Sequence, residues 1–182
     1  KVVRIAGDGI AIEITEAVSA ILEQAGAQIE CVDARAGLGA YEELGSPLPD
    51  ETVAAIREYK VLLKGPLTTP VGTGFRSVNV ALRQHFDLYA NIRPTRTLPS
   101  IDSPFKQVDM VIFRENTQGL YIGKEHWVDE DKKTHAESIA VVTEQASERI
   151  IRAAFEYAVT HDRQKVSLVH KANILKFTTG LF

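Results

Sequence analysis

Arginines near strand ends and at a helix start are the residues of this 182-residue chain with the clearest chemical potential. Arg76 and Arg83 fall in an expected helix over 75–85, Arg93 follows an expected strand, and Arg114 closes another. Folds of the α/β class place ligands where parallel strands end and helices begin. Guanidinium groups bind carboxylates as planar forks, so converging arginines suit a substrate with two or three carboxylates. The alternative is that these arginines form a solvated surface without a ligand.

Two polar residues near the start of the 75–85 helix add to the pattern. Ser77 and Asn79 lie where backbone N–H groups are unpaired, and Arg83 follows Asn79 by about one turn on the same face. A hydroxyl, an amide and a guanidinium could therefore bind one anion together. The alternative is that Ser77 and Asn79 only satisfy backbone groups of the first turn.

The elements that must position these residues alternate between strand and helix. This order is typical of a parallel sheet with crossover helices, because a hairpin would need close turn signals that are absent here. After residue 94 the pattern changes to a β-prone segment over 108–113, an irregular charged stretch over 119–143 and a long amphipathic helix over 144–160. The further expected strands cover 1–6, 28–33, 61–64, 138–143 and 165–170. The further expected helices cover 12–25 and 50–59, with Asp50 as the cap of the latter, and the opening turns of another helix cover 174–182.

Ordered motifs resemble the metal-dependent β-decarboxylating dehydrogenases that oxidise isocitrate or 3-isopropylmalate. KGPLTTPVGTGFRSVNVALR at 64–83 and LYANIRP at 88–94 resemble the substrate region of the isocitrate dehydrogenase branch. VIFRENTQGLY at 111–121 resembles the second signature of the family, and VHKANILK at 169–176 resembles the third. Within the family, the Ser77-x-Asn79 pair is similar to the isocitrate branch, whose substrate has a third carboxylate.

The resemblance implies an architecture. We expect an α/β fold with a parallel or mixed sheet and flanking helices, divided into a large domain, a small domain and a β clasp, with the C-terminal half of the family fold absent. Residues 1–87 would form the first part of the large domain. Residues 88–118 and 144–182 would belong to the small domain, and 119–143 to a clasp that intertwines with a second subunit. The apolar end Leu181-Phe182 and the missing initiator Met lead us to expect a partial chain.

The resemblance also implies roles for single residues. Tyr121 and Lys171 would be the acid–base pair, with Lys171 acting across a homodimer interface. Thr68, Thr69 and Asn173 would approach the nicotinamide end of the cofactor. The residues that would hold the isocitrate carboxylates are Ser77, Asn79, Arg83, Arg93 and Arg114, with Lys64 close by.

The reaction implied is oxidation of isocitrate by NAD or NADP, followed by loss of carbon dioxide to give 2-oxoglutarate. Mg²⁺ or Mn²⁺ would polarise the reacting oxygen, with metal ligands expected outside this chain. The segment 121–131 resembles NAD-using members more than NADP-using ones. The alternatives are a non-catalytic subunit or fragment that binds isocitrate, and a sibling 3-isopropylmalate or homoisocitrate dehydrogenase.

One motif departs from the family. Gly7-Asp8-Gly9 lies at a strand-to-helix turn but lacks the third glycine of a G-x-G-x-x-G phosphate loop. Family members usually have Gly-Pro after Gly9-Ile10, whereas this chain has Ala11-Ile12, so the local cofactor contact is open.

Composition excludes other classes of protein. The chain is 45% hydrophobic and 25% charged, as in ordinary globular proteins, and its formal net charge is −3. Nucleic acid is not expected as a partner because phosphate binding needs a basic excess. No run approaches the roughly 18 apolar residues of a membrane span. We expect a cytoplasmic protein, or a mitochondrial-matrix protein if eukaryotic, in the tricarboxylic acid cycle.

Overall fold

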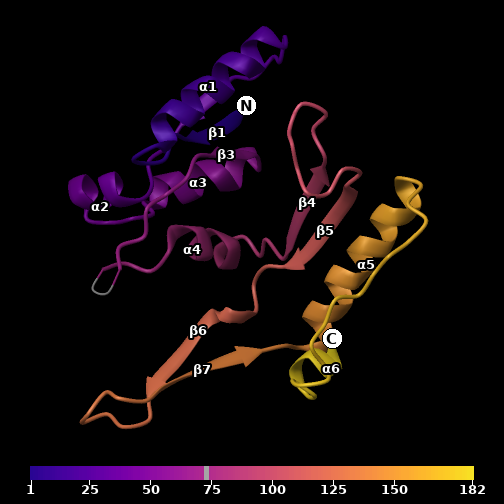
Figure 1. Cartoon of the computed structure of the whole chain (residues 1–182). Helices are drawn as coiled ribbons and strands as arrows, with labels where there is room; N and C mark the ends of the chain where they lie inside the picture. The colour runs from indigo at the N-terminus through magenta and orange to yellow at the C-terminus, as the bar shows by residue number, and fades with distance from the viewer. Residues whose placement is uncertain (72–73) are drawn as a thin grey trace. The chain divides into compact units, whose positions relative to one another are not determined.

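The computed structural model describes residues 1–71 and 74–182 (Figure 1). The chain divides into two compact units, Lys1–Ala81 and Leu82–Phe182, and each is described by itself. The assignment of 1–87 to a large domain, of 88–118 and 144–182 to a small domain, and of 119–143 to a clasp stays a prediction. Within the described residues, no helix is both long and apolar enough to cross a membrane.

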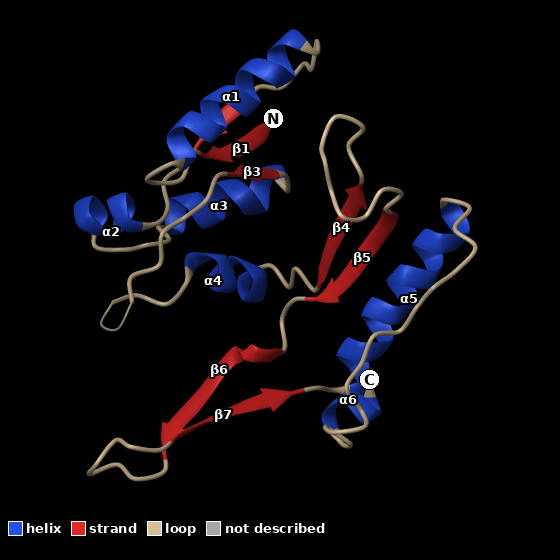
Figure 2. Ribbon diagram, in the orientation of Figure 1, coloured by secondary structure: helices blue, strands red, loops and turns tan. Residues whose placement is uncertain are grey.

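The first unit is built on a parallel sheet with strand order β2-β1-β3. The strands are β1 (Val2–Ile5), β2 (Cys31–Asp33) and β3 (Leu62–Lys64). Their crossover helices are α1 (Ala11–Gln24), α2 (Leu38–Leu44) and α3 (Asp50–Tyr59), as Figure 2 shows. The central strand buries Val3 and Ile5, each contributing about 1.5–3 kcal/mol of hydrophobic stabilisation. The predicted parallel sheet with crossover helices is therefore confirmed.

Two glycines allow the ends of β1 and β3 to approach closely. Gly7 has φ +91°, and a Cβ there would lie 2.1 Å from the Pro66 carbonyl oxygen. A Cβ on Gly65 would lie 2.1 Å from the Ala6 carbonyl oxygen and 2.8 Å from Thr15 Oγ1. Glycine alone fits at these contacts because both distances are far below van der Waals separation. The loops that follow β1 and β3 are thus held against each other.

The second unit contains two antiparallel pairs and a long helix. Strand β4 (Ala90–Arg96) pairs with β5 (Asp109–Glu115), and α5 (Glu144–Thr160) packs on β5. The rings of Phe113 and Tyr157, 5.2 Å apart, form part of this contact. Strand β6 (Gly119–Trp127) pairs with β7 (Ala136–Val141), and α6 (Thr178–Leu181) is a single turn near the end. Helix α4 (Val78–His85) spans the sequence boundary between the units.

Several expected elements differ from the structure. The strand expected over 165–170 is wrong: these residues are exposed and belong to no sheet, since no neighbouring strand pairs with them in the described chain. In residues 119–143, the strand expected over 138–143 corresponds to β7, and the part expected to be irregular contains its partner β6. Asp50 does not cap α3: Pro49 is the N-cap, and Asp50 lies in the first turn, where its charge interacts favourably with the helix dipole. The helix expected from residue 75 begins at Val78, and that expected from 174 is reduced to α6.

Candidate active site

Two arginines and a tyrosine from three elements meet in the second unit. Arg83 comes from α4, Arg114 from the end of β5 and Tyr121 from β6. Arg114 Nη2 donates a hydrogen bond of 2.7 Å to Tyr121 Oη. The guanidinium carbons of Arg114 and Arg83 lie 5.2 and 5.5 Å from the centre of the tyrosine ring. We call Arg83, Arg114 and Tyr121 the arginine–tyrosine cluster.

The cluster changes the acidity of its phenol. The hydrogen bond and the positive charge of Arg114 lower the pKa of Tyr121, burial opposes this, and Arg83 lowers the pKa further. Because the guanidinium donates to the phenol oxygen, the O–H of Tyr121 is left to point at another acceptor. The phenol of Tyr121 therefore gives up its proton more readily than that of an ordinary tyrosine.

The β4–β5 register adds another arginine to the same face of the sheet. Asn91 is opposite Arg114, and Arg93 is opposite Ile112. Paired residues and alternate residues of a strand share a face, so Asn91, Arg93 and Arg114 lie on one face. Phe113, which packs on α5, points to the other face. Arg93 Nε donates to Asn91 Oδ1 at 2.8 Å, which orients the guanidinium.

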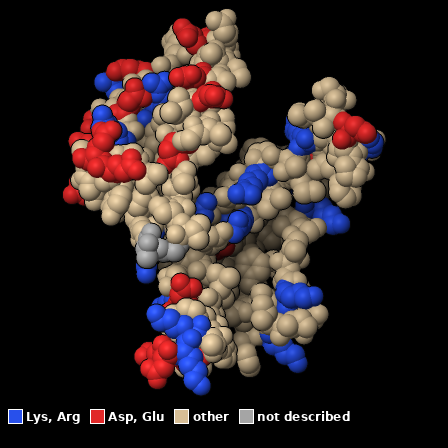
Figure 3. Space-filling model, turned by 60° about the vertical axis from the view of Figure 1, so that its left-hand side comes forward, with Lys and Arg blue, Asp and Glu red and all other residues tan. Residues whose placement is uncertain are grey.

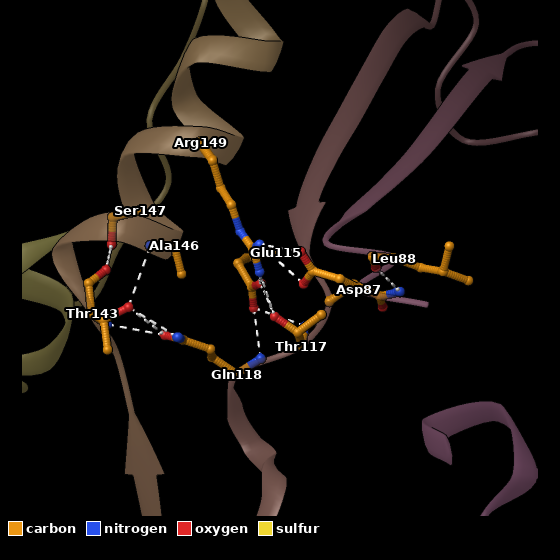
Figure 4. Close-up of polar contacts among 10 residues, drawn as sticks. Asp87, Leu88, Glu115, Thr117, Gln118, Thr143, Ala146, Ser147 and Arg149 are labelled. Atoms are coloured by element: carbon orange, nitrogen blue, oxygen red, sulfur yellow. Dashed lines mark hydrogen bonds and ion pairs between the residues drawn. The ribbon is translucent and has the colours of Figure 1, made fainter. Parts of the chain in front are cut away.

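A polar network fixes the turn between Arg114 and Tyr121 (Figure 4). The Glu115 carboxylate accepts hydrogen bonds from the backbone N–H groups of Thr117 and Gln118, at 3.0 and 2.8 Å, and from the Thr117 hydroxyl at 2.6 Å. Arg149 Nη2 donates to the same hydroxyl at 2.9 Å. The end of β5 and the start of β6 are therefore held by one carboxylate.

The same turn is tied to the start of α5. The Gln118 amide donates to Thr143 Oγ1 at 2.9 Å, and its oxygen accepts from the Thr143 N–H at 3.0 Å. Thr143 is also the N-cap of α5, since its hydroxyl accepts from the N–H of Ala146. Gln118 thus joins the turn before β6 to the first turn of α5.

A hollow of about 470 Å³ opens beside the cluster within the second unit. Arg114 and Tyr121 form part of its wall, together with apolar residues such as Leu120, Val141 and Phe182. Carboxylates need cationic or donor partners when they leave water. The apolar part of the hollow does not supply these, whereas Arg114 in its wall can do so chemically.

The charge of the chain is unevenly distributed between its units. Lys1–Ala81 has eleven acidic and seven basic residues, whereas Leu82–Phe182 has thirteen and fourteen. On the face drawn in Figure 3, acidic side chains gather over the helices of the first unit. The acidic excess thus belongs to the first unit, and the arginine–tyrosine cluster lies in the unit without one.

In the first unit, the other predicted residues follow β3. Lys64 ends that strand, Thr68 and Thr69 are exposed, and Ser77 and Asn79 are half-buried at the start of α4. The Ser77 carbonyl accepts from the N–H of Ala81 at 3.0 Å, in agreement with the expected place of Ser77 at the helix start.

Sequence reasoning missed one partner of these residues. Asp8 Oδ1 accepts hydrogen bonds from Thr68 N, at 2.7 Å, and Thr68 Oγ1, at 2.5 Å. Only its place in the Gly7-Asp8-Gly9 turn pointed to Asp8.

Lys171 and Asn173 are exposed in the stretch after α5. Within residues 82–182, neither side chain hydrogen-bonds to the arginine–tyrosine cluster. Among the described residues, no group of three or more His, Cys, Asp and Glu side chains could hold a metal ion.

The fold and the cluster describe a two-unit α/β protein in which two arginines surround a tyrosine phenol. All 182 residues match the family of isocitrate/isopropylmalate dehydrogenases, and the chain belongs to this family. The resemblance seen in the motifs is therefore confirmed.

Named relatives include both cofactor types. The chain is 42% identical over 203 residues to "Isocitrate dehydrogenase [NADP]" of Haloferax volcanii, covering 97% of the chain and 48% of the relative. It is 44% identical over 176 residues to "Isocitrate dehydrogenase [NAD] catalytic subunit 5, mitochondrial" of Arabidopsis thaliana, covering 97% and 46%. A crystal structure of isocitrate dehydrogenase from Methylococcus capsulatus superposes with a TM-score of 0.94 at 52% identity, covering 99% of this chain and 53% of that one. The chain spans about half the length of the curated relatives it matches.

Proposed function

We propose that the full-length protein containing this chain is an isocitrate dehydrogenase. Isocitrate and NAD⁺ or NADP⁺ would give 2-oxoglutarate, carbon dioxide and the reduced dinucleotide. The observation that carries the proposal is the arginine–tyrosine cluster, in which Arg114 donates to Tyr121 Oη at 2.7 Å. An arginine can bind a substrate carboxylate, and a phenol in contact with it can donate a proton to the same substrate. Their contact supports a site that does both.

Each member of the cluster has a separate task in this proposal. Arg83 and Arg114, with Arg93 on the same sheet face, bind substrate carboxylates through charge-assisted hydrogen bonds. Tyr121 donates its proton to the carbon from which carbon dioxide has departed. The lowered pKa makes this transfer easier, and the hydrogen bond from Arg114 stabilises the phenolate that remains.

Further roles are proposed from the family resemblance. Lys171 would be the base and would act across a homodimer interface, and residues 119–143 would form the clasp of that dimer. Thr68, Thr69 and Asn173 would contact the nicotinamide end of the dinucleotide, which accepts the hydride when bound. The ordered hydroxyl of Thr68 fits a polar group of that kind. Lys64, Ser77 and Asn79 would contact substrate.

The divalent metal is proposed for the full-length protein and not for this chain alone. The described residues do not form a metal site by themselves, so we assign no step to Mg²⁺ or Mn²⁺ within this chain. The proposal for the full-length protein keeps the metal requirement, with ligands supplied outside the chain.

The test is an assay of the full-length protein with isocitrate, Mg²⁺ and either NAD⁺ or NADP⁺, followed by the absorbance of reduced nicotinamide. We expect reduction with one dinucleotide, NAD⁺ being favoured by the 121–131 segment. Parallel reactions with 3-isopropylmalate and homoisocitrate should be much slower. Absence of reduction, with isocitrate still bound in calorimetry, would instead identify a non-catalytic binding subunit.

Ser77→Asp is expected to weaken isocitrate binding severely. A carboxylate at the start of α4 would repel the substrate's own carboxylates, so KM should rise at least about tenfold. Ser77→Ala is the matched control, because it removes the hydroxyl without adding charge. Unchanged KM and kcat in Ser77→Asp would remove Ser77 from the substrate site.

A further inference from the structure

The Asp8 carboxylate joins the loops that follow β1, β2 and β3 in the first unit. Its Oδ1 accepts from Thr68 N and Thr68 Oγ1, at 2.7 and 2.5 Å, and its Oδ2 accepts from the Leu38 N–H at 3.4 Å. The backbone N–H of Asp8 donates to the Pro66 carbonyl at 3.2 Å. A Cβ on Gly37 would lie 2.8 Å from Asp8 Oδ2, so the turn approaches the carboxylate closely. One side chain thus orders the end of the loop that carries Thr68.

The charge state of Asp8 determines which group donates and which accepts in its hydrogen bond with Thr68. Burial raises the pKa of Asp8, but the hydrogen bonds from Thr68 and Leu38 and the charge of Lys64 outweigh burial and lower it overall. Asp8 is therefore ionised at neutral pH and can only accept hydrogen bonds.

Because Asp8 only accepts, the Thr68 hydroxyl must be the donor of the hydrogen bond between them. A threonine hydroxyl has one proton to donate, and here that proton is directed to Asp8. What remains of Thr68 Oγ1 is acceptor capacity alone. Thr68 is exposed, so a ligand can reach this oxygen. A group with an N–H donor would be recognised there, and a carbonyl oxygen would be repelled.

We propose that Asp8 is a positioning residue that holds the Thr68 hydroxyl as an acceptor for the carboxamide N–H of the nicotinamide ring. The inference rests on the proposed function, in which Thr68 approaches the nicotinamide end of the dinucleotide. It assigns a task to the Gly7-Asp8-Gly9 turn, whose sequence does not fit a phosphate loop. Asp8 does not touch the cofactor and acts through Thr68 alone.

Binding of a cofactor analogue to the full-length protein tests the polarity. In the 3-acetylpyridine analogue of the dinucleotide, a methyl group replaces the carboxamide NH₂, so the carbonyl stays and the N–H donor is lost. Calorimetry gives Kd for the natural dinucleotide and the analogue, using NAD⁺ or NADP⁺, whichever binds more tightly. We expect the wild-type protein to prefer the natural dinucleotide by up to about tenfold, the effect of one hydrogen bond.

Substitutions separate hydrogen bonding from loop structure. Thr68→Val is expected to abolish the preference for the natural dinucleotide, and Thr68→Ser to keep it. Asp8→Asn is expected to reduce the preference. The double variant Asp8→Asn/Thr68→Val should show the same ratio of Kd values as Thr68→Val alone. A structural role alone would weaken both dinucleotides equally and leave the ratio unchanged, and that result in Thr68→Val or Asp8→Asn overturns the proposal.

Controls cover folding and the underlying function. Asp33→Asn is the matched control, since Asp33 is an acceptor for Arg4 elsewhere in the same unit and should leave the ratio unchanged. If thermal unfolding shows that Asp8→Asn does not fold, Asp8→Ser replaces it with a group that both donates and accepts. Dinucleotide binding is measured without isocitrate, so it is independent of the reaction. If the protein does not oxidise isocitrate but shows the expected ratio of Kd values, the proposed reaction is rejected and the role of Asp8 is kept. A wild-type protein that binds neither dinucleotide would overturn both.

Discussion

Arg114 and Tyr121 show how a single contact can serve two functions. The guanidinium binds the phenol oxygen at 2.7 Å, and it remains positively charged toward any carboxylate on the same sheet face. The effect on acidity has a defined pH window. The lowered pKa of Tyr121 stabilises the folded state only above the ordinary phenol pKa of about 10, and this stabilisation is lost as pH falls through the lowered value. At neutral pH the pKa shift itself therefore adds nothing to the stability of the folded state.

Arg114→Gln is expected to raise the pKa of Tyr121 toward the ordinary value. The change removes both the largest causes of the shift, the hydrogen bond and the charge. NMR titration of protein labelled with ¹³C at the tyrosine Cζ position measures this directly, and Tyr121→Phe assigns the resonance. Arg83→Gln is the matched control and should give a smaller rise, because Arg83 is the weaker contributor. Equal titration in the wild-type and Arg114→Gln proteins would contradict the assigned role.

At the scale of elements, local pattern predicted the first unit and α5 well. Strand, helix, strand, helix, strand is set by local periodicity and turn residues, and β1, α1, α3 and β3 appear close to their expected bounds. The failures need partners that local pattern does not encode. Residues 165–170 have strand-forming side chains but no neighbouring strand to pair with in the described chain.

Part of the candidate site could be predicted from motifs, and one of its contacts could not. Motifs led to Arg83, Arg114 and Tyr121, and the structure brings these three together. The hydrogen bond between Thr68 and Asp8 was missed because it joins residues 60 positions apart. Such contacts depend on the approach of two loops, for which the sequence signal is only the glycines Gly7 and Gly65.

Gly65→Ala is expected to destabilise the first unit strongly. The added Cβ would lie 2.1 Å from the Ala6 carbonyl oxygen, so backbone must move and the Asp8–Thr68 contact with it. We expect a loss of about 2–3 kcal/mol or more, seen as a lower urea midpoint. Gly39→Ala in α2 is the matched control, since its Cβ meets nothing within 4 Å and alanine favours helix. Equal midpoints for the two variants would show that the loops can separate at little cost.

At the scale of the whole molecule, the second unit leaves large apolar side chains exposed. Leu120, Trp127, Val128 and Ile139 of the β6–β7 region are each at least 44% exposed. A strand pair with several large apolar side chains left in solvent is typical of a segment that is covered in an assembly. This supports the proposal that residues 119–143 form a clasp between two subunits. In the proposed dimer, Lys171 of the partner subunit would act at Tyr121, while this chain's own Lys171 makes no hydrogen bond to Tyr121 within residues 82–182.

Mixing two inactive variants of the full-length protein tests this arrangement. Tyr121→Phe and Lys171→Met should each abolish most decarboxylation, since each homodimer lacks one group at both sites. If Lys171 acts across the interface, a heterodimer of the two variants has one site with both groups intact and one with neither. Random reassociation after co-expression should then restore about a quarter of wild-type activity, because half of the dimers are mixed and half of their sites are complete. If the two groups act within one subunit, every site lacks one of them and mixing restores nothing. Size-exclusion chromatography of the mixed sample, with differently tagged chains, confirms that heterodimers have formed before the activities are compared.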